Sequence, residues 1–401
     1  MIAGNVVAQD ADRARISPSF HDGVLTWTEH RTRPPASPTR YEPRPPAGPR
    51  APKPSRQRQK AAEKPKRTPK PPRARLAAMH PAQLEAMMGL VLAVFVAGLF
   101  GMINLVNRPV HTNAVFVGTA PNAVAVDPVT NTVYVTNNLT ETMSVIDGSK
   151  RAVIATVPVG HHPDGVAVDP GTHTVYVANS DSHTVSVIDG LTRKVTATVP
   201  VGNTPFGVAV DPGTHTVFVA NYGHPTVSVI DGSTHTVIAT VPVGNGPFGI
   251  AVDPATHVVY ATNSGDHTVS VIDGLTYAVT DTVPLGNTAG GVAVDPDTHT
   301  VYVANYGHPT VSVIDASRRI VIDSIRVGNN PFGVAVDRDT HTVYVTNFAD
   351  STLSVIDGST HAVTETVPVG NNPDAVALDP DSRTVYVTNY ADHMLSVLAA
   401  R

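Results

Sequence analysis

Seven positions spaced 42 residues apart carry the side chains that are best suited to hold a ligand. Each stands just before a short segment of the GVAVD type (165–169), and in chain order they are Asn122, Asp164, Phe206, Phe248, Gly290, Phe332 and Asp374. The two carboxyl groups and the amide can pair with a cation, and the three phenyl rings can hold it through cation–π contacts. This set predicts a site for a cationic or amphipathic ligand.

Other polar and aromatic residues stand close to this set in the sequence. His161 and His162 lie just before Asp164. Four aromatic residues begin a second variable segment of their repeats: Tyr222, Tyr306, Phe348 and Tyr390. A divalent cation at Asp164, Asn122 and Asp374 is an alternative ligand, but hard cations need more oxygen atoms than these residues supply, so no metal site is predicted.

Signatures of catalysis are sparse. Residues 109–401 contain two glutamates, Glu141 and Glu365, and the whole chain contains no cysteine. We find no Ser-His-Asp spacing and no motif for a nucleotide or a quinone, so no cofactor is expected. An enzyme needs an acid, base or nucleophile that breaks the repeat symmetry, and its best place here is the cluster of His161, His162 and Asp164.

The repeat itself indicates which elements position these residues. A V-x-V-G signature recurs every 42 residues from Val115 to Val367, with VPLG at 283 and IRVG at 325 as variants. Each unit holds four short Val/Thr-rich segments, separated by turn sequences such as DPGTH; in the second unit they are 165–169, 174–179, 184–189 and 194–201. Four strands in a unit of this length match one blade of a β-propeller.

The phase of the repeat predicts how the ring closes. The repeats begin on a fourth-strand segment at 111–117 and end on a third-strand segment at 394–400. Pairing the two segments completes the last blade and leaves no open sheet edge there. We predict an all-β fold over 109–401, a seven-bladed β-propeller of four-stranded antiparallel blades, closed by the N-terminal strand in the last blade.

Ring closure also predicts which of the seven positions are neighbours. The last and first blades are adjacent, so Asp374, Asn122 and Asp164 form one acidic arc at the channel mouth, opposite an aromatic arc of phenylalanines. The loops that vary most lie on the same face, which is therefore the predicted binding face. In the alternative, the phenyl rings plug the channel and the Asp side chains cap turns. The Asp and His residues that recur in the turns, such as Asp169 and His173, are assigned to the scaffold rather than to a metal.

The blade sequences resemble a known family. YVTN stands at 134–137, 344–347 and 386–389, with YVAN, FVAN and YATN in the other blades, preceded by VAVDP and followed by VSVIDG. This pattern covers about 290 residues and resembles the YVTN-repeat β-propeller family, whereas the GH…WD residues of WD40 blades are missing. The resemblance implies a surface or periplasmic propeller and implies little about chemistry.

A basic segment begins the chain. Residues 1–84 hold 17 Lys/Arg and 6 Asp/Glu, a net charge of +11, and are so rich in proline that we predict a disordered cytoplasmic arm. Such an arm can contact anionic lipid head groups or nucleic acid. The alternatives are a solvated tail without a partner, or upstream sequence included by a start codon placed too early, with Met79, Met87 or Met88 as the true start.

An apolar segment follows the arm. The 21 residues from 86 to 106 carry no charge and as a helix would span roughly 30 Å, so we predict a transmembrane helix over 85–107. Basic residues are dense before it and sparse after it, which places the arm in the cytoplasm and the repeats outside the cell. A cleavable signal peptide is the alternative, but the leader is long and a cleavage site is poorly matched.

Together these patterns predict a single-pass cell-membrane protein with an extracytoplasmic propeller. We expect a non-catalytic binding module for a peptide, glycan or protein ligand of the cell envelope. The alternative is an enzyme such as a streptogramin-type lyase, whose propeller has a similar blade pattern, with its site at the channel mouth. The net charge of −16 over 109–401 excludes nucleic acid as a partner of the propeller.

Overall fold

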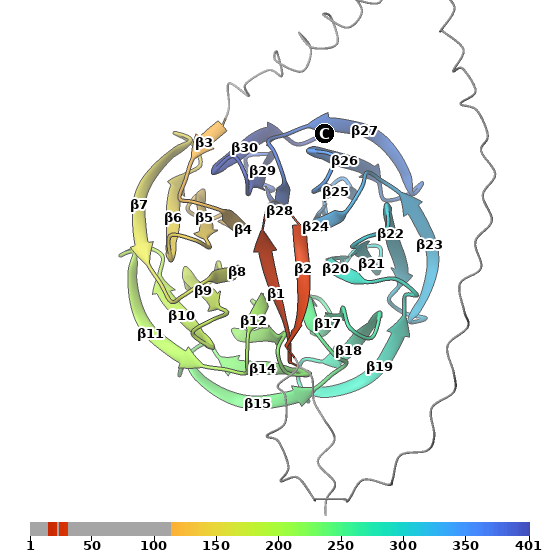
Figure 1. Ribbon diagram of the computed structural model, residues 1–401, viewed down its shortest axis with the longest axis horizontal. Helices are drawn as coiled ribbons and strands as arrows, with labels where there is room; N and C mark the ends of the chain where they lie inside the picture. The colour runs from red at the N-terminus through yellow and green to blue at the C-terminus, as the bar shows by residue number, and fades with distance from the viewer. Residues whose placement is uncertain (1–14, 22–23, 31–113) are drawn as a thin grey trace, which may run out of the picture. The chain divides into compact units, whose positions relative to one another are not determined.

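The computed structural model describes residues 15–21, 24–30 and 114–401 (Figure 1). Near the N-terminus, β1 (Arg15–His21) and β2 (Val24–His30) pair in a two-stranded sheet, which was not expected within the predicted disordered arm. The rest of that arm and the predicted transmembrane helix at 85–107 lie outside the described residues. Within the described ranges, no helix is long and apolar enough to cross a bilayer.

Residues 114–401 form the predicted ring of seven four-stranded antiparallel sheets (Figure 1). The first blade consists of β4 (Pro121–Asp127), β5 (Thr132–Asn137), β6 (Thr142–Asp147) and β7 (Ala152–Pro158). The second blade consists of β8 (Pro163–Asp169), β9 (Thr174–Asn179), β10 (Thr184–Asp189) and β11 (Lys194–Pro200). The third consists of β12 (Pro205–Asp211), β13 (Thr216–Asn221), β14 (Thr226–Asp231) and β15 (Thr236–Pro242). The fourth blade consists of β16 (Pro247–Asp253), β17 (Val258–Asn263), β18 (Thr268–Asp273) and β19 (Ala278–Pro284). The fifth consists of β20 (Ala289–Asp295), β21 (Thr300–Asn305), β22 (Thr310–Asp315) and β23 (Ile320–Arg326). The sixth is β24 (Pro331–Asp337), β25 (Thr342–Asn347), β26 (Thr352–Asp357) and β27 (Ala362–Pro368).

The seventh blade confirms the predicted closure. Its first three strands are β28 (Pro373–Asp379), β29 (Thr384–Asn389) and β30 (Met394–Ala399), and its outer strand is β3 (Ala114–Phe116) from the start of the repeats. β3 pairs antiparallel with β30, with Val115 opposite Leu395. Both side chains are buried in a cluster that also contains residues of the first blade, so closure joins the two ends of the ring.

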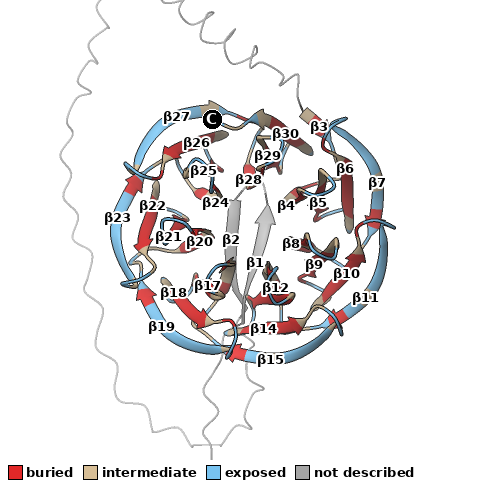
Figure 2. Cartoon of the chain, turned by 180° about the vertical axis from the view of Figure 1, so that it is seen from behind, coloured by how far each residue is buried: buried red, intermediate tan, exposed pale blue. Residues whose placement is uncertain are grey.

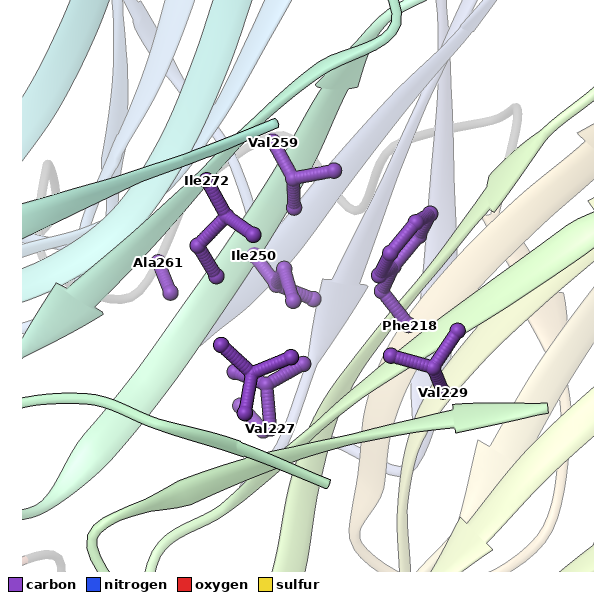
Figure 3. Close-up of a cluster of buried hydrophobic side chains, with 9 residues drawn as sticks. Phe218, Val227, Val229, Ile250, Val259, Ala261 and Ile272 are labelled. Atoms are coloured by element: carbon purple, nitrogen blue, oxygen red, sulfur yellow. The ribbon is translucent and has the colours of Figure 1, made fainter. Parts of the chain in front are cut away.

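The hydrophobic core lies between the blades. Each of seven clusters combines residues from two adjacent sheets, and Figure 3 shows the one between the third and fourth blades, whose members include Phe218, Val227, Val229, Ile250, Val259 and Ile272. Full burial of such a side chain stabilises the fold by about 1.5–3 kcal/mol relative to its exposure. The middle strands are buried on both faces and the outermost strands are exposed (Figure 2), which explains why the same apolar pattern recurs in every blade.

The asparagine of the YVTN segment connects three parts of the second blade. Asn179 is fully buried, and its Nδ2 donates to Thr184 Oγ1 and Ser186 Oγ at 3.2 and 3.0 Å. Its Oδ1 accepts from the backbone N of Gly160, in the preceding loop, at 3.0 Å. A Cβ at Gly160 would lie 2.6 Å from the Asn179 amide carbon, so only glycine fits there. This contact ties the two variable loops to the rigid sheet.

The recurring Asp and His residues connect neighbouring blades. His215 Nδ1 lies 2.6 Å from Oδ2 of Asp169, a buried residue at the end of the innermost strand of the preceding blade. The same contact joins three other pairs, and Arg383 takes the place of His opposite Asp337 at 3.1 Å. These residues therefore have the scaffold placement that their repetition predicted, with the contact made across the blade boundary.

Candidate functional site

An irregularity in every innermost strand positions the seven mouth residues. In the second blade, Pro163 pairs with Asn179 and the next paired residue is Val166, so Asp164 and Gly165 face one residue, Ala178. This is a β-bulge, which re-aims a side chain out of the ladder. All seven innermost strands carry it at the equivalent place. The bulge leaves the mouth residue outside the regular pairing, at the end of the channel.

A cavity of about 170 Å³ occupies the mouth of the channel. Five of the predicted residues line it: Asn122, Phe206, Phe248, Phe332 and Asp374. A cavity of about 150 Å³ is enough to hold a benzene molecule, so this one accepts a small head group rather than a whole large ligand. The phenyl rings line the cavity and are half-buried, and they leave this volume open.

The acidic arc forms around Asp164. Its Oδ1 accepts from Asn122 Nδ2 at 2.8 Å and from Asn138 Nδ2 at 3.0 Å, and the residue is only 5% exposed. Burial raises the pKa of Asp164 to about 7, and the charge of Asp181 adds to this rise, while hydrogen bonds from Ser180 and Asn138 oppose it. The carboxyl of Asp164 is therefore close to half-protonated at neutral pH.

Asp374 is the less satisfied of the two acids. It is 4% exposed, and its buried Oδ1 has no hydrogen-bond partner among the described residues. Burial holds the pKa of Asp374 well above its usual range, and the nearby charge of Asp164 raises it further. Burial raises the pKa of Tyr390, and the charges of Asp374 and Asp164 raise it further, so the phenol of Tyr390 stays neutral. A buried acceptor without a donor is rare in folded proteins and favours a ligand-binding role.

The aromatic arc is a continuous set of ring contacts. Phe206 and Phe248 stack with their centroids 4.2 Å apart, and Phe248 meets Phe332 edge to face at 5.4 Å. The second contact spans the position between these two phenylalanines in the ring, which is occupied by Gly290. Three more rings pack against this set: Tyr222 on Phe248, and Tyr306 and Phe348 on Phe332. The predicted tyrosines therefore support the phenyl wall from its outer side.

The two predicted histidines lie in the adjacent loop and pair with other acids. His161 Nδ1 is 2.8 Å from Glu141 Oε1, and this contact raises the pKa of the exposed imidazole. His162 Nε2 is 3.6 Å from Asp181 Oδ2. Neither contact brings an imidazole to Asp164. Within residues 15–21, 24–30 and 114–401, no group of three or more His, Cys, Asp or Glu side chains is arranged to hold a metal ion.

The third residue of the YVTN segment, which is Thr in four blades and Ala in three, also distinguishes the two arcs, and the sequence analysis did not use it. Thr136 Oγ1 donates to the carbonyl oxygen of Asp164 in the next blade at 2.7 Å, and Thr346 does the same to Asp374. Thr262 and Thr388 make this bond to Gly290 and Asn122. The other three blades have Ala at this position, and in each case the next mouth residue is Phe. A hydroxyl thus holds the backbone of each small or polar mouth residue, whereas ring contacts position the phenylalanines.

Asn138 is a further site residue that the sequence analysis did not single out. It follows the YVTN segment of the first blade, where the other blades have Ser, Tyr or Phe. Its contact with Asp164 crosses a blade boundary, so the period alone does not reveal it. The signal that could have found it is the departure from the repeat at position 138, where Asn follows the recurring asparagine of the YVTN segment.

Comparison with known proteins identifies the fold and no family. No family model matches the chain, and no curated protein matches it. A solved structure titled Kuenenia stuttgartiensis Hydrazine Synthase is similar, with a TM-score of 0.63 and 19% identity, covering 70% of this chain and 96% of that chain. At this identity the similarity supports the β-propeller fold alone.

Proposed function

We propose that this protein is a non-catalytic binding module that takes a cell-envelope ligand at the channel mouth of its propeller. The observation that carries the proposal is Asp374, which lines a cavity walled by phenyl rings and whose buried Oδ1 is an acceptor without a donor among the described residues. An unsatisfied buried carboxyl costs stability, and a ligand that donates to it recovers that cost on binding. The repeated residues support a rigid ring, and the departures from the repeat gather at this cavity.

The cellular setting is part of the same proposal. The uncharged segment within 85–107 anchors the chain in the cell membrane, with the basic arm in the cytoplasm and the propeller outside. The YVTN segments support a propeller of the YVTN-repeat type, and such an exposed ring would meet peptides, glycans or proteins of the envelope. The basic arm contributes contact with anionic lipids.

A capture experiment tests the binding face. The full-length chain with Asp164→Ala and Phe206→Ala is compared with the parent in pull-downs from envelope extract. The matched control carries Asp297→Ala and Leu275→Ala, which change an acid and an apolar residue in exposed turns on the opposite face. We expect the mouth variant to lose components that the parent and the control retain. Equal recovery by all three chains excludes the mouth as the site.

Cysteine labelling tests the topology, because the chain contains no native cysteine. A membrane-impermeant maleimide is added to intact cells that carry either Ser233→Cys in the propeller or Ser55→Cys in the arm. We expect Ser233→Cys to be labelled on intact cells and Ser55→Cys to be labelled only after lysis. The reverse pattern contradicts the proposed orientation.

One observation favours an enzyme as the second candidate function. The pKa of Asp164, about 7, lies in the range that suits a general acid or base. The histidines of the adjacent loop pair with Glu141 and Asp181, so Asp164 would act without an imidazole partner. Ring opening of a cyclic depsipeptide by the purified chain, abolished by Asp164→Asn, would replace the binding module with a streptogramin-type lyase.

A further inference from the structure

We propose that the channel mouth recognises a primary ammonium group, with Asp374 as its acceptor and the phenyl wall packed against the attached carbon chain. This inference rests on the proposed binding function and names the chemical class of the ligand. The same group occurs on lysine-like side chains of peptides and on amino sugars, and the experiment below distinguishes these two sources.

The acceptors available at the mouth select the shape of the cation. Asp164 Oδ1 already accepts from Asn122 and Asn138, so its nearer lone pairs are occupied. Asp374 Oδ1 is the buried acceptor left open in this arc of the described chain. A single open oxygen suits a compact ammonium, which carries its charge at one point, better than a guanidinium, which needs two parallel acceptors. A quaternary ammonium has no N–H to donate and would leave this oxygen unsatisfied.

The phenyl wall suits the rest of such a group. Phe206, Phe248 and Phe332 line the same cavity as Asp374 with a half-buried aromatic surface, and Phe332 belongs to the blade next to that of Asp374. Phenyl faces attract a cation and pack well against methylene groups. The cavity of about 170 Å³ has room for an ammonium with a short alkyl chain, and the remainder of the ligand would lie over the variable loops.

The titration of the two acids couples this binding to pH. Asp181 raises the pKa of Asp164, hydrogen bonds from Ser180 and Asn138 lower it, and Asp164 raises the pKa of Asp374. Asp374 in turn raises the pKa values of Tyr306 and Tyr390, and no Lys or Arg of the described ranges contributes to the pKa of either acid. The pair therefore holds a proton near neutral pH, and an ammonium ion binds best after that proton has left. Because burial raises the pKa of both acids, they are protonated to a greater extent at pH 5.5 than at pH 8.5, where alkyl amines are still protonated, so the affinity should be weaker at pH 5.5.

Isothermal titration calorimetry on the purified full-length chain tests this inference. The probes are Nα-acetyl-lysinamide and its analogue without the ammonium, Nα-acetyl-norleucinamide, with 6-amino-6-deoxyglucose and glucose as the sugar pair. We expect one charged probe to bind at pH 8.5, its uncharged partner to bind at least tenfold more weakly, and the affinity of the charged probe to fall at pH 5.5. The pair that shows this difference identifies the peptide or the sugar source.

Variants locate the effect. Asp374→Asn should weaken binding at least tenfold at pH 8.5, whereas Asp297→Asn, the same charge change in an exposed turn, should leave it unchanged. If Asp374→Asn does not fold, Asp374→Gly replaces it, because Gly290 occupies the equivalent position after a Thr blade. Equal binding of charged and uncharged probes, or binding that ignores Asp374, overturns the inference. If the mouth variants lose envelope capture but the parent binds no amine, the ammonium inference alone is overturned. If the mouth variants capture envelope components as well as the parent does, the proposed function is overturned as well.

Discussion

The pH dependence of stability should change when the carboxyl of Asp164 is removed. The folded-state pKa of about 7 lies above the model-peptide value of 3.8, so the folded protein binds a proton that the unfolded chain releases. The resulting destabilisation is absent below about pH 4, grows as the pH rises, and is complete above about pH 7. Between pH 5 and pH 8 it amounts to about 3 kcal/mol, at about 1.4 kcal/mol for each pKa unit.

Urea denaturation of the full-length chain at pH 5 and pH 8 measures this contribution. We expect the free energy of unfolding of Asp164→Asn, relative to the parent, to rise by about 3 kcal/mol between the two pH values. Asp297→Asn serves as the control for the change of a carboxyl to an amide, since its side chain lies in an exposed turn. Parallel pH profiles for the parent and Asp164→Asn would refute the assignment of a buried, partly protonated acid at the mouth.

Three further predictions concern the scaffold, and thermal or urea denaturation checks each of them. Deleting residues 109–118 removes β3 and the burial of Val115, and should lower the free energy of unfolding by about 3 kcal/mol or more; an unchanged transition would argue against ring closure. Asn179→Ala removes three hydrogen bonds in the buried interior and should cost about 2–4 kcal/mol, whereas Thr172→Ala in an exposed turn should cost less than about 0.5 kcal/mol. His215→Ala leaves the buried Asp169 without its inter-blade partner and should cost about 1–2 kcal/mol, with a negligible effect contradicting the role given to this contact.

The architecture could be predicted because the 42-residue period contains both the strands and their connections. Val, Thr and turn residues alternate in a pattern that only short strands satisfy, and the phase of the pattern at the two ends predicts the pairing of β3 with β30 that the structure has. The two arcs at the mouth followed from the same phase, since neighbouring blades bring Asp374, Asn122 and Asp164 together.

The chemistry of the site was less accessible from the sequence, because it depends on burial and on contacts across blade boundaries. The pattern placed two acids near each other, but it could not show that Asp164 and Asp374 are nearly inaccessible to solvent or that one oxygen lacks a donor. His161 and His162 are adjacent to Asp164 in sequence, yet the loop directs them to Glu141 and Asp181. Sequence proximity within a turn does not determine side-chain direction.

Site-specific photo-crosslinking on intact cells tests the central claim most directly, namely that departures from the repeat at the mouth form the ligand site. Benzoylphenylalanine is placed at Phe206, in the phenyl wall, or at Leu275, in an exposed turn of the opposite face. We predict a crosslinked envelope component from position 206 that disappears when Asp374→Asn is added, and none from position 275. Crosslinking from position 275 alone, or crosslinking at 206 that persists without the Asp374 carboxyl, would contradict the claim.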